Sequence, residues 1–366
     1  MSEARYADRR VRALEAAEAA GLGGILVAPG PDLAYLTAYA PPPLERLTLL
    51  VLSAGAEPTL VVPTLERPLA ESAAGAPGLT MLDWRDGRDD PHAVVTAMLG
   101  AGRYAVTDRT WASHLLSLQR AAPGRPFVAA SEALPLLRAV KDADEIRRLR
   151  AAGSAADAAF AEVIEEPFAG RAETEIADEL DRLLREHGHQ RVDFTVVGSG
   201  PNAASGHHEP GERRIEPGDA VVMDFGGVRD EYCSDLTRTV FVGEPSQEQR
   251  EVYAIVLAAQ QAAFEAVRPG VAAQDVDRAA RTVITDAGYG DRFVHRTGHG
   301  IGLEVHEPPY IVEGDETPLE PGMTFSDEPG IYLAGRFGVR IEDQVAVTDR
   351  GAERLNEADR KLTIVA

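Results

Sequence analysis

Two β-prone runs between residues 219 and 242 each carry an aspartate where a strand normally has an apolar side chain. A Gly-Gly-Val-Arg-Asp-Glu stretch separates them, so the segment predicts a β-hairpin. With its turn centred on Val228–Glu231, Asp224 is expected opposite Asp235, with Cβ atoms about 5 Å apart. Two carboxylates at that distance repel unless a cation or a proton lies between them. An exposed hairpin with solvated aspartates is the alternative, and this segment alone leaves the two interpretations equal.

Three of the nine histidines of the chain fall between residues 295 and 306. Glycines surround the middle one, His299, and glycine permits backbone shapes that are closed to other residues. They are Gly298, Gly300 and Gly302. The stretch predicts a loop that fixes His299 toward a ligand, although a single histidine taken alone is more often structural.

Two further strand-like segments, 325–332 and 337–347, each place a glutamate where the pattern wants an apolar residue. Strand alternation puts Arg340, Glu342 and Gln344 on one face. Glu328 and Glu342 are therefore expected to point inward with the two aspartates. Four inward carboxylates and one imidazole make a poor core and a good site for two divalent metal ions, about 3.5–4 Å apart.

A chain of 366 residues is long enough for two domains. Alternating helical and strand patterns predict an α/β domain over residues 1–135, without any cluster of ligand-type residues. A long helical stretch from about 131 to 165 places the boundary near 135–140, so that 136–366 forms the second domain. The charged middle of that stretch, 141–150, is expected to be exposed on one side. Further helices are predicted at 173–187, 246–268 and 273–287.

The net charge of −22 disfavours nucleic acid and anionic membrane surfaces and favours cations. The first residues lack the apolar core of a signal peptide, and no later segment offers the roughly 18 apolar residues of a membrane span. The single cysteine, Cys233, excludes an internal disulfide and a cysteine-based zinc site. These features together predict a cytoplasmic enzyme.

Four motifs occur in a fixed order along the second domain: Asp224-x10-Asp235, Thr297-Gly-His-Gly-Ile-Gly, Glu328-Pro-Gly-Ile-Tyr and Val339-Arg-Ile-Glu-Asp. In this order they resemble the creatinase / methionine aminopeptidase superfamily, and within it the Xaa-Pro dipeptidase (prolidase) and aminopeptidase P branch. The resemblance spans essentially the whole chain. It implies an α+β pita-bread catalytic domain preceded by a smaller creatinase-type α/β N-terminal domain.

The same resemblance implies a metal set of five residues. Asp224 would chelate one ion, Asp235 and Glu342 would bridge both ions, and His299 and Glu328 would bind the other ion. Oxygen-rich ligands with a single imidazole favour Mn²⁺, with Co²⁺ or Zn²⁺ as further candidates. The implied reaction is attack on the scissile carbonyl by a hydroxide that bridges the two ions, with Glu328 as proton shuttle.

Four more residues match substrate-contacting positions of the branch. His207 matches a histidine that faces the scissile bond, and His306 one that contacts the substrate carbonyl. His295 matches a substrate-pocket histidine, and Arg340 an arginine beside the metals. The chain departs from the branch just before His207, where Ser205-Gly206 replaces the usual Leu-Pro.

The implied substrate is a small peptide with proline after the scissile bond, bound by a homodimer that contacts neither nucleic acid nor membrane. A bond to proline nitrogen has no N–H, and the imidazole faces of His207 and His295 would accept the proline ring. The modest N-terminal domain favours a dipeptidase over an aminopeptidase.

Two other functions occur on the same fold: a non-peptide amide hydrolase or lyase (creatinase-like or ectoine-hydrolase-like), and a catalytically inactive binding module. Competent residues at all five ligand positions disfavour both. Four residues near the motifs keep a structural interpretation. His208 is expected to be a mere neighbour of His207 and Cys233 a buried filler, while Tyr232 and Thr237 are equally suited to strand packing or to hydrogen bonding beside the site.

Overall fold

The computed structural model describes residues 3–206 and 208–366. The chain divides into two compact units, Met1–Arg138 and Ala139–Ala366, and each is considered by itself. Among the described residues, no helix combines the length and the hydropathy that a membrane span requires.

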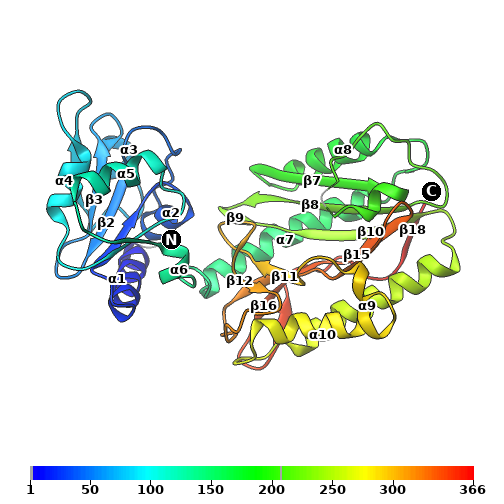
Figure 1. Ribbon diagram of the computed structural model, residues 1–366. Coiled ribbons are helices and arrows are strands. Elements are labelled where there is room, and N and C mark those ends of the chain that lie inside the picture. The colour runs from blue at the N-terminus through cyan, green and yellow to red at the C-terminus, as the bar shows by residue number, and fades with distance from the viewer. Residues whose placement is uncertain (1–2, 207) are drawn as a thin grey trace. The chain divides into compact units, whose positions relative to one another are not determined.

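The N-terminal unit is built on a six-stranded sheet of order β4-β3-β2-β1-β5-β6 (Figure 1). Its strands are β1 (Gly24–Val27), β2 (Leu49–Ser53), β3 (Thr59–Pro63), β4 (Thr80–Trp84), β5 (Tyr104–Val106) and β6 (Phe127–Ala129). Its helices are α1 (Glu3–Ala19), α2 (Pro31–Thr37), α3 (Arg67–Glu71), α4 (Pro91–Met98), α5 (Ala112–Ala121) and α6 (Ala130–Ala133). The central strands β1 and β2 are buried along their whole length, which explains their continuous apolar runs. The predicted α/β domain is confirmed.

The second unit contains two five-stranded sheets, ordered β18-β10-β8-β7 with β9 on β8, and β12-β11-β13-β16-β17, beside the hairpin β14-β15. The strands of the first sheet are β7 (Arg191–Ser199), β8 (Ala220–Arg229), β9 (Tyr232–Cys233), β10 (Leu236–Val242) and β18 (Thr363–Val365). The others are β11 (Gly298–Gly300), β12 (Glu307–Ile311), β13 (Thr324–Asp327), β14 (Gly330–Leu333), β15 (Phe337–Arg340), β16 (Asp343–Val347) and β17 (Ala352–Arg354). An isolated bridge between Thr237 and Glu342 joins the two sheets.

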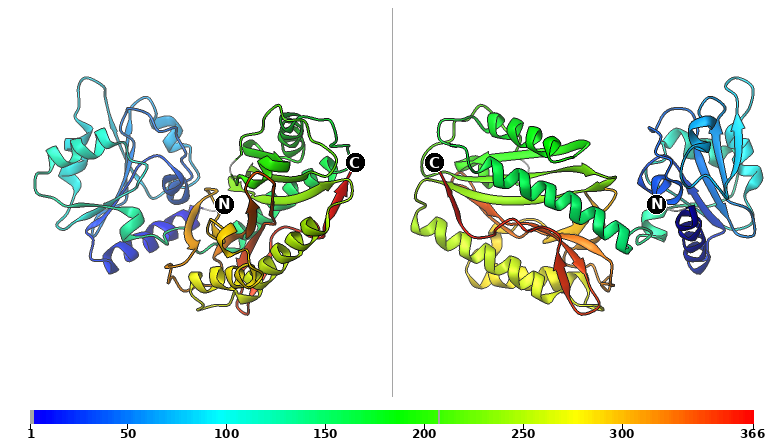
Figure 2. Two further views of the ribbon diagram at one scale, coloured as in Figure 1. Left: turned by 45° about the vertical axis from the view of Figure 1, so that its right-hand side comes forward. Right: turned by 180° about the vertical axis from the view of Figure 1, so that it is seen from behind.

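Four helices cover these sheets: α7 (Ala143–Val163), α8 (Glu173–Glu186), α9 (Gln247–Ala266) and α10 (Ala273–Asp286). In both views of Figure 2 the green helices α7 and α8 lie on one side of the unit and the yellow helices α9 and α10 on the other. The long helical stretch predicted from residue 131 is interrupted between α6 and α7. Asp142 caps α7 in a capping box with Glu145, which sets the start of that helix.

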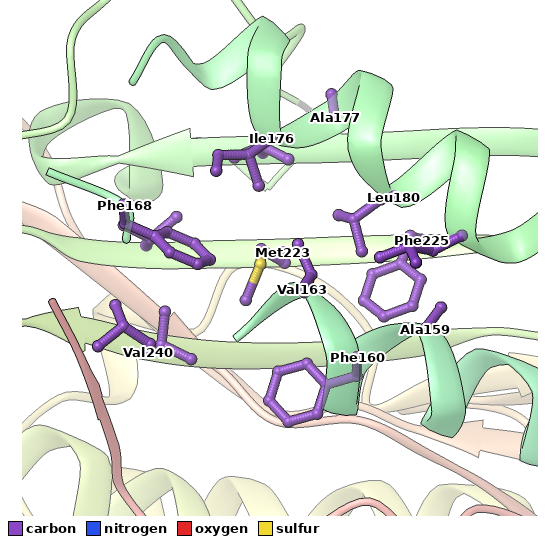
Figure 3. Packing of buried hydrophobic residues seen from close by; sticks show 14 of the residues in the cluster. Ala159, Phe160, Val163, Phe168, Ile176, Ala177, Leu180, Met223, Phe225 and Val240 are labelled. Atoms are coloured by element: carbon purple, nitrogen blue, oxygen red, sulfur yellow. The ribbon is translucent and has the colours of Figure 1, made fainter. Parts of the chain in front are cut away.

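The core of the second unit forms where α7 and α8 pack on the first sheet. Figure 3 shows Phe160 of α7 and Leu180 of α8 meeting Met223 and Phe225 of β8, all buried. Each such side chain contributes about 1.5–3 kcal/mol when fully removed from water. The apolar face of β8 is thereby fixed against the helices.

The hairpin of β8 with β9 and β10 has a different register from the one predicted. Arg229 pairs with Tyr232, so the turn is Asp230-Glu231, and both residues have positive φ (51° and 73°). Asp224 therefore pairs with Thr237 and not with Asp235. The predicted pairing was wrong because the turn lies one residue later than expected. A two-residue turn with positive φ at both positions matches the twist of antiparallel strands, and Asp230-Glu231 form this turn. Here non-glycine residues adopt that turn, and the glycines upstream do not.

The second unit consists of two halves with matching backbone hydrogen bonds. Gly170 precedes α8, and its N–H donates to the carbonyl of Ile215. Gly270 precedes α10, and its N–H donates to the carbonyl of Leu319. Both glycines have a φ of 85°, outside the range that other residues favour. Nine residues after Ile215 comes Asp224, and nine residues after Leu319 comes Glu328.

Candidate metal centre

Three buried side chains from different parts of the second unit meet at the junction of its two sheets. Asp235, His299 and Glu342 each offer a ligand atom, and these atoms lie within 4.8 Å of one another. Asp235 directly precedes β10, His299 is the central residue of β11, and Glu342 lies between β15 and β16. Only the fold brings them together, because they are far apart in the sequence.

Glu328 and Asp224 complete the acidic surroundings of this cluster. Glu328 directly follows β13, and its Oε1 lies 3.3 Å from Nε2 of His299. Asp224 lies on β8, where its Oδ2 accepts a hydrogen bond of 2.5 Å from Arg340. Oδ1 of Asp224 and Oε1 of Glu342 are buried without a hydrogen-bond partner, which is the environment that a bound cation would complete.

Crowding of the carboxylates shifts their titration. Burial raises the pKa of Glu328 to about 7, with Arg340 opposing the rise and Asp224 adding to it. Burial also raises the pKa of Asp235, further increased by Asp224 and Glu328. The pKa of Glu342 is raised by burial and then by Asp235. Divalent cations would remove this repulsion, so the residues present fit such ions.

The tautomer of His299 follows from its hydrogen bonds. Nδ1 lies 3.2 Å from the carbonyl of Gly300, which only accepts, so Nδ1 carries the proton. Nε2 lies 3.5 Å from Oδ2 of Asp235. Burial, followed by the nearby His306, lowers the pKa of His299 to about 3. The ring is therefore neutral, with the Nε2 lone pair available for a metal ion.

The glycines beside His299 allow neighbouring strands to approach closely. A Cβ on Gly298 would collide with the carbonyl oxygen of Ser326, and a Cβ on Gly300 with that of Glu307. Neither glycine has a positive φ. The prediction attributed them to unusual backbone shapes, but the structural reason is lack of space.

A chain of hydrogen bonds leads from His295 to the acidic cluster. Nδ1 of His295 donates to the carbonyl of Arg296 (2.7 Å), so Nε2 accepts from the Tyr332 hydroxyl (2.8 Å). Arg340 donates to the same hydroxyl (2.9 Å) and also binds Asp224. The sequence analysis missed Tyr332, although it is the tyrosine of the Glu328-Pro-Gly-Ile-Tyr motif.

The side chain of Thr237 reaches the cluster as well. Its hydroxyl donates to Oε2 of Glu342 (2.6 Å) and accepts from Nε of Arg340 (3.1 Å). Of its two equal interpretations, hydrogen bonding beside the site is the one that the structure shows. Tyr232 instead donates to Glu145 (2.7 Å), away from the cluster.

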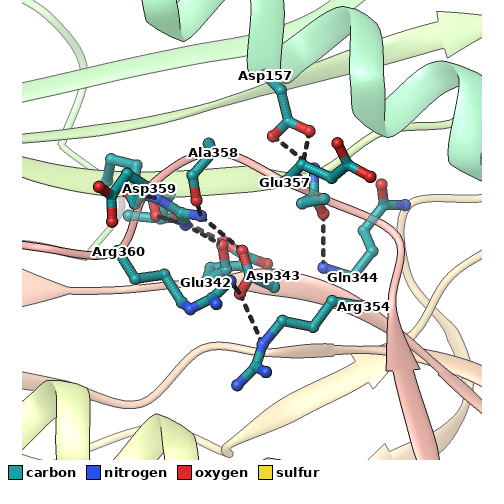
Figure 4. A network of polar contacts seen from close by, with 12 residues as sticks. Asp157, Glu342, Asp343, Gln344, Arg354, Glu357, Ala358, Asp359 and Arg360 are labelled. Atoms are coloured by element: carbon teal, nitrogen blue, oxygen red, sulfur yellow. Dashed lines mark hydrogen bonds and ion pairs between the residues drawn. The ribbon is translucent and has the colours of Figure 1, made fainter.

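The backbone of Glu342 is held by the polar network shown in Figure 4. The buried guanidinium of Arg238 donates to the carbonyl of Glu342 (2.6 Å) and to Oδ1 of Asp343 (2.6 Å). Oδ2 of Asp343 pairs with Arg360 (3.0 Å) and Arg354 (3.2 Å). Three arginines thus neutralise the carboxylate next to Glu342, and this carboxylate is not available as a ligand.

The remaining predicted residues surround the cluster. The imidazole of His306 lies edge-on to that of His299, with ring centroids 4.0 Å apart. His207 lies outside the described residues. On one side of it, the carbonyl of Gly206 accepts a hydrogen bond from Arg340 (3.3 Å). On the other, His208 pairs with the buried Glu173 (2.8 Å), as befits a structural neighbour.

Cys233 is buried, and burial raises the pKa of its thiol. A buried neutral thiol is neither a nucleophile nor a metal ligand. The interpretation of Cys233 as a filler of the core is therefore supported.

Comparisons with known proteins match this geometry over nearly the whole chain. The model of metallopeptidase family M24 matches residues 147–349, and that of the creatinase/prolidase N-terminal domain matches residues 9–140. The probable dipeptidase PepE of Mycobacterium tuberculosis is 47% identical over 364 residues, covering 98% of this chain and 96% of the relative. The Xaa-Pro dipeptidase of Pyrococcus furiosus is 38% identical over 311 residues, covering 84% and 87%.

Among solved structures, the dipeptidase PepE of Mycobacterium ulcerans superposes with a TM-score of 0.95 at 46% identity, covering 100% of this chain and 99% of that one. The prediction of a pita-bread catalytic domain that follows a creatinase-type domain in the sequence is confirmed. The chain is a member of metallopeptidase family M24 with a creatinase/prolidase N-terminal domain.

Proposed function

We propose that this M24 enzyme is an Xaa-Pro dipeptidase that releases proline from dipeptides. The observation that carries the proposal is the buried meeting of Asp235, His299 and Glu342 with Glu328 and Asp224 beside them. The similarity to dipeptidases over the full chain supports the same conclusion.

These five residues would hold two divalent ions, with Mn²⁺ favoured by the oxygen-rich set. The ions would be held by Asp235, His299 and Glu342, with Asp224 and Glu328 beside them. When bound, such ions would supply Lewis acidity and would lower the pKa of water, so that hydroxide is available as the nucleophile near neutral pH.

The residues of the chain then position the substrate and move the proton. Glu328 stands at the edge of the cluster, where Ser326 donates to its Oε1 (3.1 Å). It takes the proton that the attacking water loses and passes it to the departing proline nitrogen. His306, beside His299, donates to the oxygen of the former carbonyl as negative charge develops there.

Proline is recognised by side chains that need no N–H from the substrate. Both ring nitrogens of His295 are already engaged, by Arg296 and Tyr332, so its ring presents carbon atoms to the pyrrolidine. In this proposal His207 faces the scissile bond. Arg340 donates to both Tyr332 and Asp224 and so keeps these two side chains in place. The expected homodimer stays a prediction, which sedimentation of the metal-loaded protein would test.

The test begins with metal-free protein reloaded with Mn²⁺. Proline release from an Xaa-Pro dipeptide is measured beside amino-acid release from an Xaa-Pro-Xaa tripeptide and turnover of an Xaa-Ala dipeptide. We expect metal-dependent cleavage, fastest for Xaa-Pro. Faster cleavage of the tripeptide would make the enzyme an aminopeptidase. Binding of about two ions per chain without cleavage of any peptide would overturn the proposal in favour of a non-peptide amide hydrolase.

A further inference from the structure

The segment 293–297, which carries His295 into the site, is fastened to helix α10 by a single guanidinium. Arg281 donates to the carbonyls of Phe293 (3.0 Å) and His295 (2.8 Å). Its guanidinium carbon also lies 4.2 Å from the centre of the Phe293 ring. Two carbonyls and an aromatic face are thus held by one planar group, a geometry that lysine cannot reproduce.

A buried carboxylate one turn earlier on α10 completes the attachment. Asp277 is fully buried, and both of its oxygens pair with Arg281 at 2.9 Å. Its Oδ1 also accepts from the backbone N–H (3.1 Å) and the hydroxyl (2.8 Å) of Thr297. The carboxylate therefore orients Arg281 and fixes the end of the segment 293–297.

The two attachments lead to different parts of the site. Arg281 holds the backbone of His295, whose ring packs edge-on against Phe293 with centroids 5.1 Å apart. Asp277 holds Thr297, whose carbonyl accepts a hydrogen bond of 2.8 Å from the backbone N–H of Glu328. One helix-borne ion pair thus fixes both the substrate-pocket histidine and a residue of the metal set.

We propose that Asp277 and Arg281 are positioning residues that divide this task. Arg281 sets the His295 ring against the proline of the substrate and so governs recognition. Asp277 orients Arg281 and, through Thr297, also fixes the backbone of Glu328. Because Glu328 moves the proton in the proposed reaction, Asp277 also governs turnover. The inference rests on the proposed function, because it assumes that His295 contacts the substrate.

The first test compares Arg281→Lys with Arg278→Lys in the full-length, Mn²⁺-loaded enzyme. Arg278 lies on the same helix and pairs at the surface with Glu313 and Asp275, so it is a matched control. We expect R281K to raise KM for Xaa-Pro and the inhibition constant of free proline about tenfold, the factor for a lost charge-assisted hydrogen bond. Its kcat and metal content should stay within about twofold of wild type, and R278K should change neither constant.

A second variant, Asp277→Asn, should raise KM and also lower kcat, because it weakens the support of Thr297 along with that of Arg281. General loosening of the fold would lower kcat in both variants alike. Equal kinetics for R281K and R278K, or a loss in R281K confined to kcat, would overturn the proposal. If R281K does not fold, unchanged kinetics in D277N would overturn it.

Failure of the proposed function gives a distinct result. If wild-type enzyme cleaves no Xaa-Pro dipeptide, the same comparison is made with whichever substrate it does cleave. A rise of KM in R281K for that substrate supports the positioning role alone, and an unchanged KM refutes it.

Discussion

The buried ion pair between Lys141 and Glu307 gives a sharp test of the energetics of the second unit. Their side chains are only 1% and 2% exposed, and Nζ lies 2.5 Å from Oε1. As predicted, the stretch 141–150 is exposed on one side, and Lys141 belongs to its buried side together with Glu145 and Leu149. Lys141→Met removes the positive charge of this pair and leaves the carboxylate of Glu307 in the interior. We expect a loss of about 3–5 kcal/mol in the free energy of unfolding.

The matched control is an ion pair of the same length at the surface. Arg278 and Glu313 also lie 2.5 Å apart, but their side chains are 49% and 59% exposed. Water screens that pair, so Arg278→Met should change the free energy of unfolding far less than Lys141→Met does. The double variant Lys141→Met/Glu307→Leu replaces the buried pair with apolar groups. It should recover most of the loss, because neither charge is then left in the interior.

The assay exploits the position of the two tryptophans. Trp84 and Trp111 both lie in the unit Met1–Arg138, so their fluorescence follows that unit alone. Far-ultraviolet circular dichroism follows both units. In urea, K141M should move the dichroism transition of the second unit and leave the fluorescence transition unchanged. For a unit of this size the expected fall in its melting temperature is about 6–20 °C.

Two results would refute this reasoning. One is a cost for K141M no larger than that for R278M, which would mean that burial does not determine the strength of the pair. The other concerns the single variants Lys141→Met and Glu307→Leu. If their effects on the free energy of unfolding add up to that of the double variant within about 0.5 kcal/mol, the two charges do not interact.

Three further predictions concern the metal set, the substrate pocket and the N-terminal unit. Glu342→Gln removes a charge from the metal set and should lower Mn²⁺ occupancy and activity about 100-fold or more. Glu313→Gln at the surface should change neither. Metal analysis after dialysis and kinetic assays measure both quantities. Tyr332→Phe removes the hydroxyl between His295 and Arg340 and should raise KM for Xaa-Pro about tenfold at unchanged metal content; an unchanged KM would show that the hydroxyl does not orient His295. Burial lowers the pKa of both His92 and His114, with Asp90 opposing the shift at His92. Their contribution to stability is therefore present above the unfolded-state pKa of about 6.5 and is lost as pH falls below it. The urea midpoint of tryptophan fluorescence should fall between pH 7 and pH 5 in wild type, and less in His114→Asn.

Sequence patterns were sufficient for the helices and for the residue types of the candidate metal centre. The predicted helices at 173–187 and 273–287 agree with α8 and α10 to within a residue, because the apolar periodicity that marks them is a local property of the sequence. The acidic residues stood out because strands rarely carry them.

Long-range placement was harder to predict. The hairpin register depended on positive φ at both Asp230 and Glu231. Aspartate adopts such a φ fairly often, but glutamate does not, so the turn position was not evident from the residue types. The burial of Lys141 depends on Glu307, far away in the sequence, and the role of Tyr332 on Arg340 and His295. Such contacts form only in three dimensions and leave no periodic pattern in the sequence.

The matching hydrogen bonds of the two halves of the second unit are what duplication of one half-length chain would produce. Asp224 and Glu328 occupy corresponding positions in the halves, so the centre lies where two copies of one half would meet. A symmetric pair of identical half-length chains would bring those two carboxylates together at its axis. Gene duplication and fusion would then free each copy to diverge.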